Sequence, residues 1–182
     1  MSKNNTIYIG IDPGKQGFIA IIKDEENIFF PMPYERLDGK SVFCEKCLKP
    51  LVEEIKDLCE GYEIKVGIEQ VGGRGGWSAT NNFNFGYTAG LQKLMMIMID
   101  ADILMVRPAK WQSVMRSGYD NIKKASSTGK TMVNDSKAIA EFIAVSEWPD
   151  IDFRKSTRAR KNDDNKIDAF LIAQYLKRID GK

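Results

Sequence analysis

The sequence contains no histidine and only three cysteines, and both shortages narrow the chemistry open to it. Without histidine, the chain lacks the most common general base and the most common nitrogen ligand of zinc. The cysteines are Cys44, Cys47 and Cys59. One C-x-x-C pair, with neither a second pair nor a histidine, cannot complete a usual four-ligand zinc site. We therefore expect reduced, packed cysteines in a cytoplasmic protein.

Long apolar runs are also missing. No stretch approaches the roughly 20 apolar residues that span a bilayer, and the first residues, MSKNNTIYIG, contain no signal-peptide core. Hydrophobic residues make up 43% of the chain and charged residues 29%, as in an ordinary globular protein. A length of 182 residues predicts one domain over 1–182. The lack of a long apolar run predicts that the protein has no membrane partner.

The formal net charge of +2 is distributed unevenly along the chain. Residues 107–161 contain twelve Lys or Arg against six Asp or Glu, whereas the rest of the chain contains fifteen against nineteen. A basic segment on an otherwise mildly acidic chain favours a polyanionic partner. The alternative is a lysine-rich loop that is merely solvated.

The pattern of apolar residues predicts an α/β fold. Three β-forming runs separated by turn residues predict an antiparallel meander at 7–11, 18–22 and 28–30. The later elements expected are strands at 66–68 and 103–106, helices at 41–58, 80–99, 108–115, 136–145 and 164–179, and a mobile polar loop at 117–134. This order builds a mixed five-stranded sheet, three antiparallel strands and then two parallel ones, flanked by helices.

Acidic residues stand at the ends of these elements. Asp12 follows the first strand, and Glu69 follows the fourth. If these two strands are neighbours, both acids emerge at the same edge of the sheet. Asp164 and Asp168 lie four residues apart at the start of the last helix, which puts them on one face. That helix needs only to cross the sheet edge for four carboxylates to converge.

Four converging carboxylates repel one another unless a cation compensates their charge. Hard oxygen ligands suit Mg²⁺ or Mn²⁺. Two such ions about 4 Å apart would hold the attacking and leaving oxygens of a phosphodiester displacement. Each acid alone also has a structural interpretation. Asp12 fits a turn, Glu69 an exposed loop, and Asp163-Asp164 a helix cap. Asp168 lies between apolar residues, where a solvated carboxylate is unexpected, and the joint placement favours the metal site.

Five stretches, in the same order as in the family, resemble the RuvC family of Holliday junction resolvases, in particular the forms carried by bacteriophages. They are IGIDPG at 9–14, IEQV at 68–71, FGYTAG at 85–90, VRPAKW at 106–111 and DAFLIA at 168–173. The resemblance covers most of the chain from residue 7 to 178. It implies an RNase H-like fold, a homodimer, and Mg²⁺-dependent paired nicks of opposing strands at a four-way DNA junction.

By position, the resemblance implies that Asp12, Glu69 and Asp168 are metal-binding catalytic carboxylates. Asp164 matches the fourth acid of the phage pattern. Cellular members place that acid three residues before the last one, where this chain has Asn165, and Asp163 is the alternative ligand.

The resemblance also bears on DNA contacts. Lys137 resembles a family lysine that approaches the scissile phosphate, and Lys110 is the alternative. Cellular members carry an aromatic residue, used to unstack the junction, where this chain has Gly72. Trp77 or Phe83 is the candidate replacement, unless both pack into the dimer interface or the core. The DNA-binding residues expected are Arg74, Trp77, Lys110, Lys123, Lys124, Arg154, Lys155, Arg158, Arg160 and Lys161.

The sequence therefore predicts a cytoplasmic endodeoxyribonuclease of a bacterium or a phage-infected cell. We expect a homodimer that resolves four-way and other branched DNA, with two Mg²⁺ or Mn²⁺ ions per active site and no nucleotide cofactor. One alternative is an RNase H-like nuclease for flaps or RNA–DNA hybrids, and another is a non-catalytic junction-binding protein. An actin-like or sugar-kinase ATPase also begins its phosphate loop with D-x-G, but it needs two such domains, and 182 residues are too few.

Overall fold

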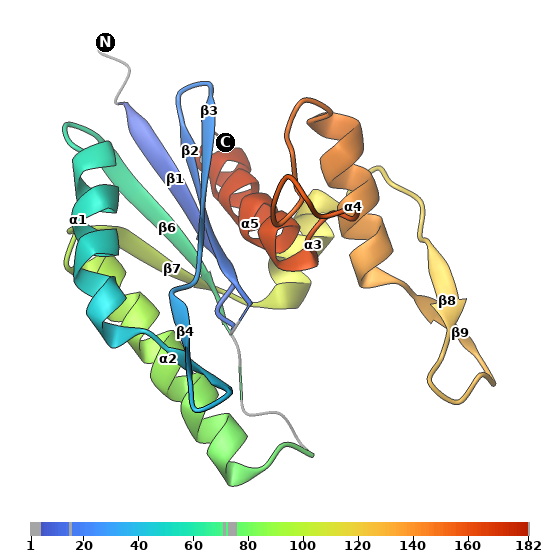
Figure 1. The fold of residues 1–182 in the computed structure, drawn as a ribbon. Coiled ribbons are helices and arrows are strands. Elements are labelled where there is room, and N and C mark those ends of the chain that lie inside the picture. Colours follow the sequence, from blue (N-terminus) through green and yellow to red (C-terminus); the bar gives the residue numbers. More distant parts are fainter. Residues whose placement is uncertain (1–4, 15, 71, 73–75, 182) are drawn as a thin grey trace.

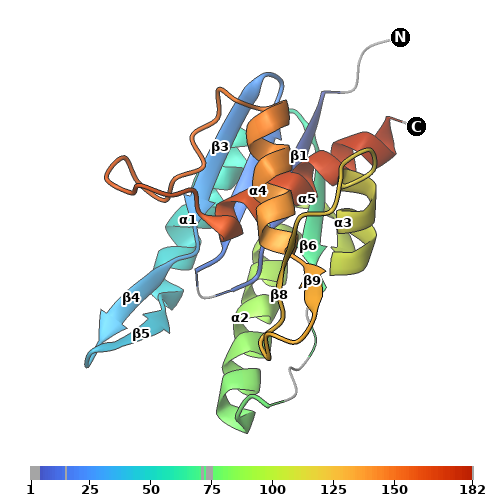
Figure 2. The ribbon, with the colours of Figure 1, turned by 90° about the vertical axis from the view of Figure 1, so that its right-hand side faces the viewer.

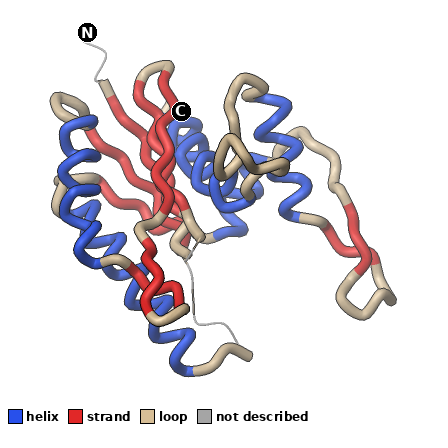
Figure 3. Tube along the Cα trace, viewed as in Figure 1, coloured by secondary structure: helices blue, strands red, loops and turns tan. Residues whose placement is uncertain are grey.

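The computed structural model describes residues 5–14, 16–70, 72 and 76–181. Its centre is a five-stranded sheet in the order β3-β2-β1-β6-β7 (Figures 1 and 3). The first three strands pair antiparallel, and β6 and β7 run parallel to β1. The predicted mixed sheet is confirmed. Its strands are β1 (Thr6–Ile11), β2 (Phe18–Lys23), β3 (Glu26–Pro31), β6 (Glu63–Glu69) and β7 (Asp102–Val106).

Helices cover both faces of this sheet (Figure 1). One apolar core lies under α1 (Leu48–Leu58) and α2 (Ala79–Ile97). A second core lies between the sheet and α5 (Asp164–Asp180), against which α3 (Pro108–Met115) and α4 (Ser136–Glu147) pack. In the described part of the chain, no helix is both long and apolar enough to cross a membrane.

Alternation along β1 divides its side chains between the two cores. Ile7, Ile9 and Ile11 belong to the core under α1 and α2, whereas Tyr8 packs against the core under α5. Successive side chains of a strand point to opposite faces. Residue Asp12, which follows Ile11, therefore continues on the α5 face.

Glycines allow α5 to approach this face closely. A Cβ on Gly10 would lie 2.0 Å from the backbone oxygen of Ala169 and 2.5 Å from the backbone nitrogen of Ala173. A Cβ on Gly67, in β6, would lie 2.8 Å from Cγ2 of Ile172. A side chain at Gly10 would push the helix off the sheet. The close contact brings the first turns of α5 next to the ends of β1 and β6.

A hairpin that the sequence analysis missed follows β3. Strand β4 (Tyr34–Leu37) pairs with β5 (Lys40–Phe43), although a helix was predicted from residue 41. Asp38 and Gly39 form the turn with φ of 50° and 74°, and Asp-Gly is a strong hairpin signal because both positions need positive φ. The apolar spacing of α1 begins only after the hairpin.

A second hairpin was also missed. Strands β8 (Lys123–Ala125) and β9 (Met132–Asn134) pair antiparallel within the segment predicted as a polar loop. Figure 1 shows the hairpin projecting from the body of the molecule beyond α4. Every residue of both strands is exposed, so no apolar alternation marked them in the sequence.

Cys44 and Cys47 form a disulfide, which corrects the expectation of reduced cysteines. The 3₁₀ helix η1 (Glu45–Cys47) turns the chain so that their Cα atoms lie 5.3 Å apart, within the span of a disulfide. Cys59 is free and buried, as expected. Burial raises the pKa of its thiol to about 11.

Candidate functional site

Asp12 and Glu69 stand at equivalent positions on neighbouring strands. β1 and β6 are parallel, with Ile11 opposite Ile68. Both isoleucines belong to the core under α1 and α2, so the acids beside them turn toward α5. The two carboxylates therefore emerge side by side at one edge of the sheet.

Asp168 joins these acids from α5. Burial, followed by the charges of Asp168 and Glu69, raises the pKa of Asp12 to about 8. Burial, followed by the charges of Glu69 and Asp164, raises the pKa of Asp168 to about 7. Carboxylates influence one another in this way only when they are close and poorly solvated. Without a cation, the cluster therefore retains protons near neutral pH.

The two acids at the start of α5 have different partners. Asp163 is the N-cap and accepts hydrogen bonds from the backbone nitrogens of Asn165 and Lys166. Asp164 accepts a hydrogen bond of 2.7 Å from Nζ of Lys137, at the start of α4. Asp163 thus stabilises the N-terminus of α5. Asp164 forms an ion pair with Lys137, for which a divalent metal ion could compete.

Two residues of the α3 region, missed in the sequence analysis, also act on the cluster. The buried Trp111 donates a hydrogen bond of 2.9 Å from Nε1 to Oε1 of Glu69. The charge of Arg116 opposes the rise in the pKa of Asp168, and burial lowers the pKa of Arg116 itself. Trp111 ends the stretch VRPAKW and could have been found there, whereas Arg116 belongs to none of the five matching stretches.

The donor set fits a divalent cation chemically, because carboxylate oxygens are the ligands that Mg²⁺ and Mn²⁺ prefer. Within the described residues, however, no group of three or more His, Cys, Asp or Glu side chains is already arranged to hold a metal ion. Two of the four acids have protein partners, since Trp111 donates a hydrogen bond to Glu69 and Lys137 donates one to Asp164.

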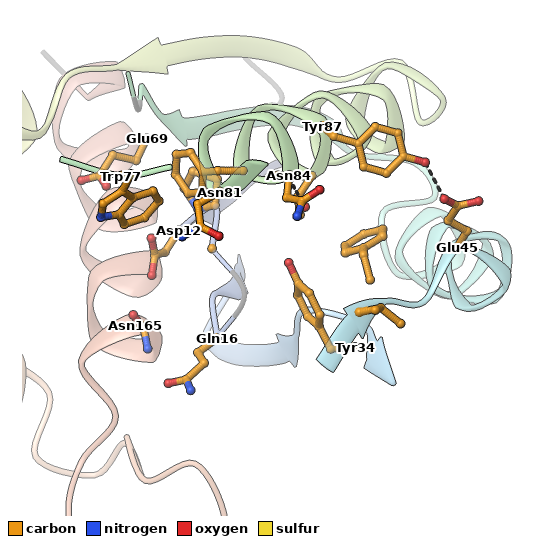
Figure 4. Close-up of a pocket in the computed structure, with 16 residues that line it drawn as sticks. Asp12, Gln16, Tyr34, Glu45, Glu69, Trp77, Asn81, Asn84, Tyr87 and Asn165 are labelled. Atoms are coloured by element: carbon orange, nitrogen blue, oxygen red, sulfur yellow. Dashed lines mark hydrogen bonds between the residues drawn. The ribbon is translucent and has the colours of Figure 1, made fainter. Parts of the chain in front are cut away.

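A cavity of about 560 Å³ extends from the cluster toward the β4–β5 hairpin and α2 (Figure 4). Asp12 and Glu69 line one end of it, and Tyr34 and Tyr87 line the other. Tyr87 donates a hydrogen bond to Glu45 at the far end. Amide and aromatic side chains line the space between, among them Gln16, Asn81, Asn84, Asn165, Trp77 and Phe85.

No protein-family model and no curated protein matches this sequence. Among solved structures, the chain is similar to Thermus thermophilus RuvC, with a TM-score of 0.50, 12% identity and 96% of each chain covered. It is also similar to T. thermophilus RuvC in complex with Holliday junction substrate, with a TM-score of 0.50, 10% identity and 96% of each chain covered. The chain has a RuvC-like fold. At this identity the likeness concerns the fold alone, and the predicted RNase H-like fold class is confirmed.

The exposed lysines predicted to bind DNA lie on two elements of this RuvC-like fold. Lys110 is on α3, and Lys123 and Lys124 are on β8. Lys124 forms a salt bridge of 3.0 Å with Asp135. Arg74, predicted to bind DNA, lies outside the described residues.

The remaining cations form a closed loop directly before α5. A bridge between Arg154 and Asn162 closes the loop, and the backbone nitrogen of Asp163 donates to the oxygen of Phe153. Figure 2 shows the loop extending outward before the chain enters α5. Arg154 makes two hydrogen bonds of 2.8 Å to the carboxylate of Asp152. The exposed members of the loop are Lys155, Arg158, Arg160 and Lys161.

The two candidate aromatic residues are both exposed, so neither packs into the core. Trp77 is 41% exposed, lines the cavity and meets the ring of Phe85 edge-on. Phe83 is 72% exposed and stacks on Tyr87. Of the two, only Trp77 lines the cavity beside the acids.

Proposed function

We propose that this chain is a metal-dependent endodeoxyribonuclease that acts on branched DNA, four-way junctions in particular. The observation that carries the proposal is the convergence of Asp12, Glu69 and Asp168, where burial, followed by the charges of the neighbouring carboxylates, raises the pKa of both aspartates. The similarity to T. thermophilus RuvC, solved with a Holliday junction substrate, supports the choice of DNA. The four-residue spacing of Asp164 and Asp168 supports a phage-type member.

In the proposed mechanism, Asp12, Glu69, Asp164 and Asp168 would hold two Mg²⁺ or Mn²⁺ ions per active site. Such ions would neutralise the negative charge of the acids and make water more acidic near neutral pH. Trp111 orients the Glu69 carboxylate. Lys137, once it is released from Asp164, stabilises the negative charge that develops on the phosphate.

We further propose that a second copy of the chain covers an apolar surface on α2 and β7. Leu94 and Ile97 on α2, and Met98 directly after it, are between 49% and 57% exposed, and β7, an edge strand, exposes Met105. Such surfaces mark interfaces, and a two-fold dimer matches the symmetry of paired cuts. Ile97→Glu should then yield monomers by light scattering, while Val145→Glu, at an exposed position of α4, should not.

The test of the function is cleavage of a synthetic four-way junction with and without Mg²⁺. Wild-type protein should nick opposing strands only with the metal, and Asp12→Asn and Asp168→Asn should abolish cleavage while the circular dichroism spectrum stays unchanged. Asp57→Asn, an exposed acid of α1, is the matched control and should cleave normally. Near wild-type cleavage by Asp12→Asn contradicts the mechanism.

The same assay on other substrates separates the alternatives. A flap and an RNA–DNA hybrid are offered beside the junction, at equal concentration. Preferential cleavage of either would change the substrate assignment. Tight junction binding without any metal-dependent cleavage would instead identify a non-catalytic binding protein.

A further inference from the structure

The cavity beside the acids is lined by side chains that suit a neutral aromatic ligand. Among its described lining residues there is no lysine or arginine, and its charged groups are the carboxylates of Asp12, Glu69 and Glu45. Away from any metal ion held by the acids, a phosphate has no cationic partner among these residues. The walls instead combine aromatic rings with side-chain amides, which suits a neutral planar group with several donors and acceptors.

We propose that this cavity holds one unstacked nucleoside of the DNA strand next to the scissile phosphate. The inference rests on the proposed function for the identity of the strand. A nucleobase is planar, uncharged and bordered by hydrogen-bonding groups, so it matches the lining. The volume of about 560 Å³ is within the usual size of small-ligand pockets and leaves room for the sugar.

Two kinds of side chain divide the recognition between them. The rings of Tyr34, Trp77 and Phe85 offer stacking surfaces, which accept any base. The amides of Asn81 and Asn84, one turn apart on α2, each offer a donor and an acceptor, which can distinguish base edges. The cavity therefore gives affinity through stacking and preference through the amides.

The walls of the cavity are joined to each other. Tyr34 comes from the β4–β5 hairpin, and the asparagines come from α2. The hydrogen bond from Tyr87 to Glu45 links α2 to the segment after the hairpin, where the disulfide between Cys44 and Cys47 closes a tight turn (Figure 4). The cavity thus exists before the DNA binds.

The first experiment tests the cavity without cleavage. Deoxyadenosine, deoxyguanosine, deoxycytidine and thymidine are titrated separately into ¹⁵N-labelled wild-type protein, with deoxyribose as the control. We expect the side-chain amide signals of Asn81 and Asn84 to shift with at least one nucleoside and not with deoxyribose. Absence of such shifts overturns the inference even if the protein cuts junctions. Shifts in a protein that cuts no DNA leave the cavity assigned and overturn the proposed function instead.

The second experiment is a double-mutant cycle on the junction. An abasic site is introduced at each of the three nucleotides on either side of the cut. We expect one position to lower kcat/KM by about tenfold in wild-type protein, the size of one stacking contact. In Tyr34→Leu and Asn84→Ala the same abasic site should cost less than it does in wild-type protein, because each variant has already removed part of the contact with the base.

The control and the contrary outcomes are specific. Phe142→Leu removes an exposed ring on α4, outside the cavity, and should keep the full abasic effect. Asn84 is exposed on a helix, so its variant remains informative if Tyr34→Leu fails to fold. Equal abasic effects in variant and wild-type proteins, or no sensitive position near the cut, would overturn the inference. Cut sites mapped on junctions of random sequence should show a base preference that Asn84→Ala weakens.

Discussion

At pH 6, Asp12 and Asp168 retain protons that ordinary aspartates have lost. The pKa values of about 8 and about 7 arise first from burial and then from neighbouring carboxylates. The positions of the acids could be predicted, because both strands end at an acid and parallel strands end at one edge. The bond from Trp111 to Glu69 could not, because no spacing rule relates α3 to β6.

These values predict how stability depends on pH. The folded pKa values lie above the unfolded value near 3.8, so the stabilising protons are fully present below pH 4 and are lost as pH rises through about 7 and 8. In EDTA, the Tm should fall between pH 5 and 9. Mg²⁺ should reduce the fall, because it favours the ionised carboxylates, and Asp12→Asn should flatten it. A Tm in EDTA that does not fall over this range contradicts the clustering of charge.

Lys137 is predicted to act in two opposite ways. It competes with a metal ion for Asp164, with which it forms an ion pair, and in the proposed mechanism it offers its charge to the substrate. Lys137→Met should therefore lower the Mg²⁺ concentration needed for half-maximal cleavage while it reduces kcat, by about a hundredfold if it is a major transition-state donor. Cleavage rates over a Mg²⁺ titration measure both effects. If Lys110→Met reduces kcat more than Lys137→Met does, the role belongs to Lys110.

At the scale of elements, the helix boundaries that depend on apolar spacing and capping residues could be predicted from the sequence. α3 begins at Pro108 and ends at Met115 as expected, and α4 and α5 begin at Ser136 and Asp164 as expected. Helix α2 begins at Ala79, one residue before the predicted start, and Ser78 is its N-cap. The β8–β9 hairpin was missed because its strands are exposed on both sides.

The docking of α5 predicts unequal effects for two glycines. Gly10→Ala meets the backbone of α5, which cannot give way, whereas Gly67→Ala meets the Cγ2 methyl group of Ile172, a side-chain atom. We expect losses of unfolding free energy of about 3 kcal/mol or more and about 1 kcal/mol, respectively. Urea denaturation measures both, and Gly90→Ala, which meets nothing within 4 Å, is the control. A smaller loss for Gly10→Ala than for Gly67→Ala would mean that α5 docks differently.

At the scale of the whole molecule, most of the exposed cations expected to bind DNA in the basic segment 107–161 lie on the β8–β9 hairpin and on the loop before α5, while Lys110 lies on α3. Composition revealed the excess charge but not which cations have partners, because pairing depends on tertiary contacts such as Arg154 with Asp152. The cavity was equally hidden, because its walls come from a hairpin and a helix that no shared motif connects. The pairing of the cations and the cavity therefore could be found only in the structure.

The loop before α5 predicts the salt dependence of DNA binding. Arg158→Ala should lower the slope of log K against log salt concentration by about 0.9, the loss of one phosphate contact. Arg154→Ala should change the slope less, because Asp152 already holds that guanidinium. Junction binding by fluorescence anisotropy at several salt concentrations measures the slopes. Equal changes in both variants would show that DNA displaces Asp152.

The late position of α5 has a consequence for synthesis on the ribosome. A nascent chain that has emerged as far as residue 160 contains the acids of β1 and β6 but neither Asp164 nor Asp168. Its second core also lacks the helix on which α3 and α4 pack. Completion of the fold and assembly of the acidic cluster are therefore one event, because an unfinished chain lacks both the two acids and the helix that carries them.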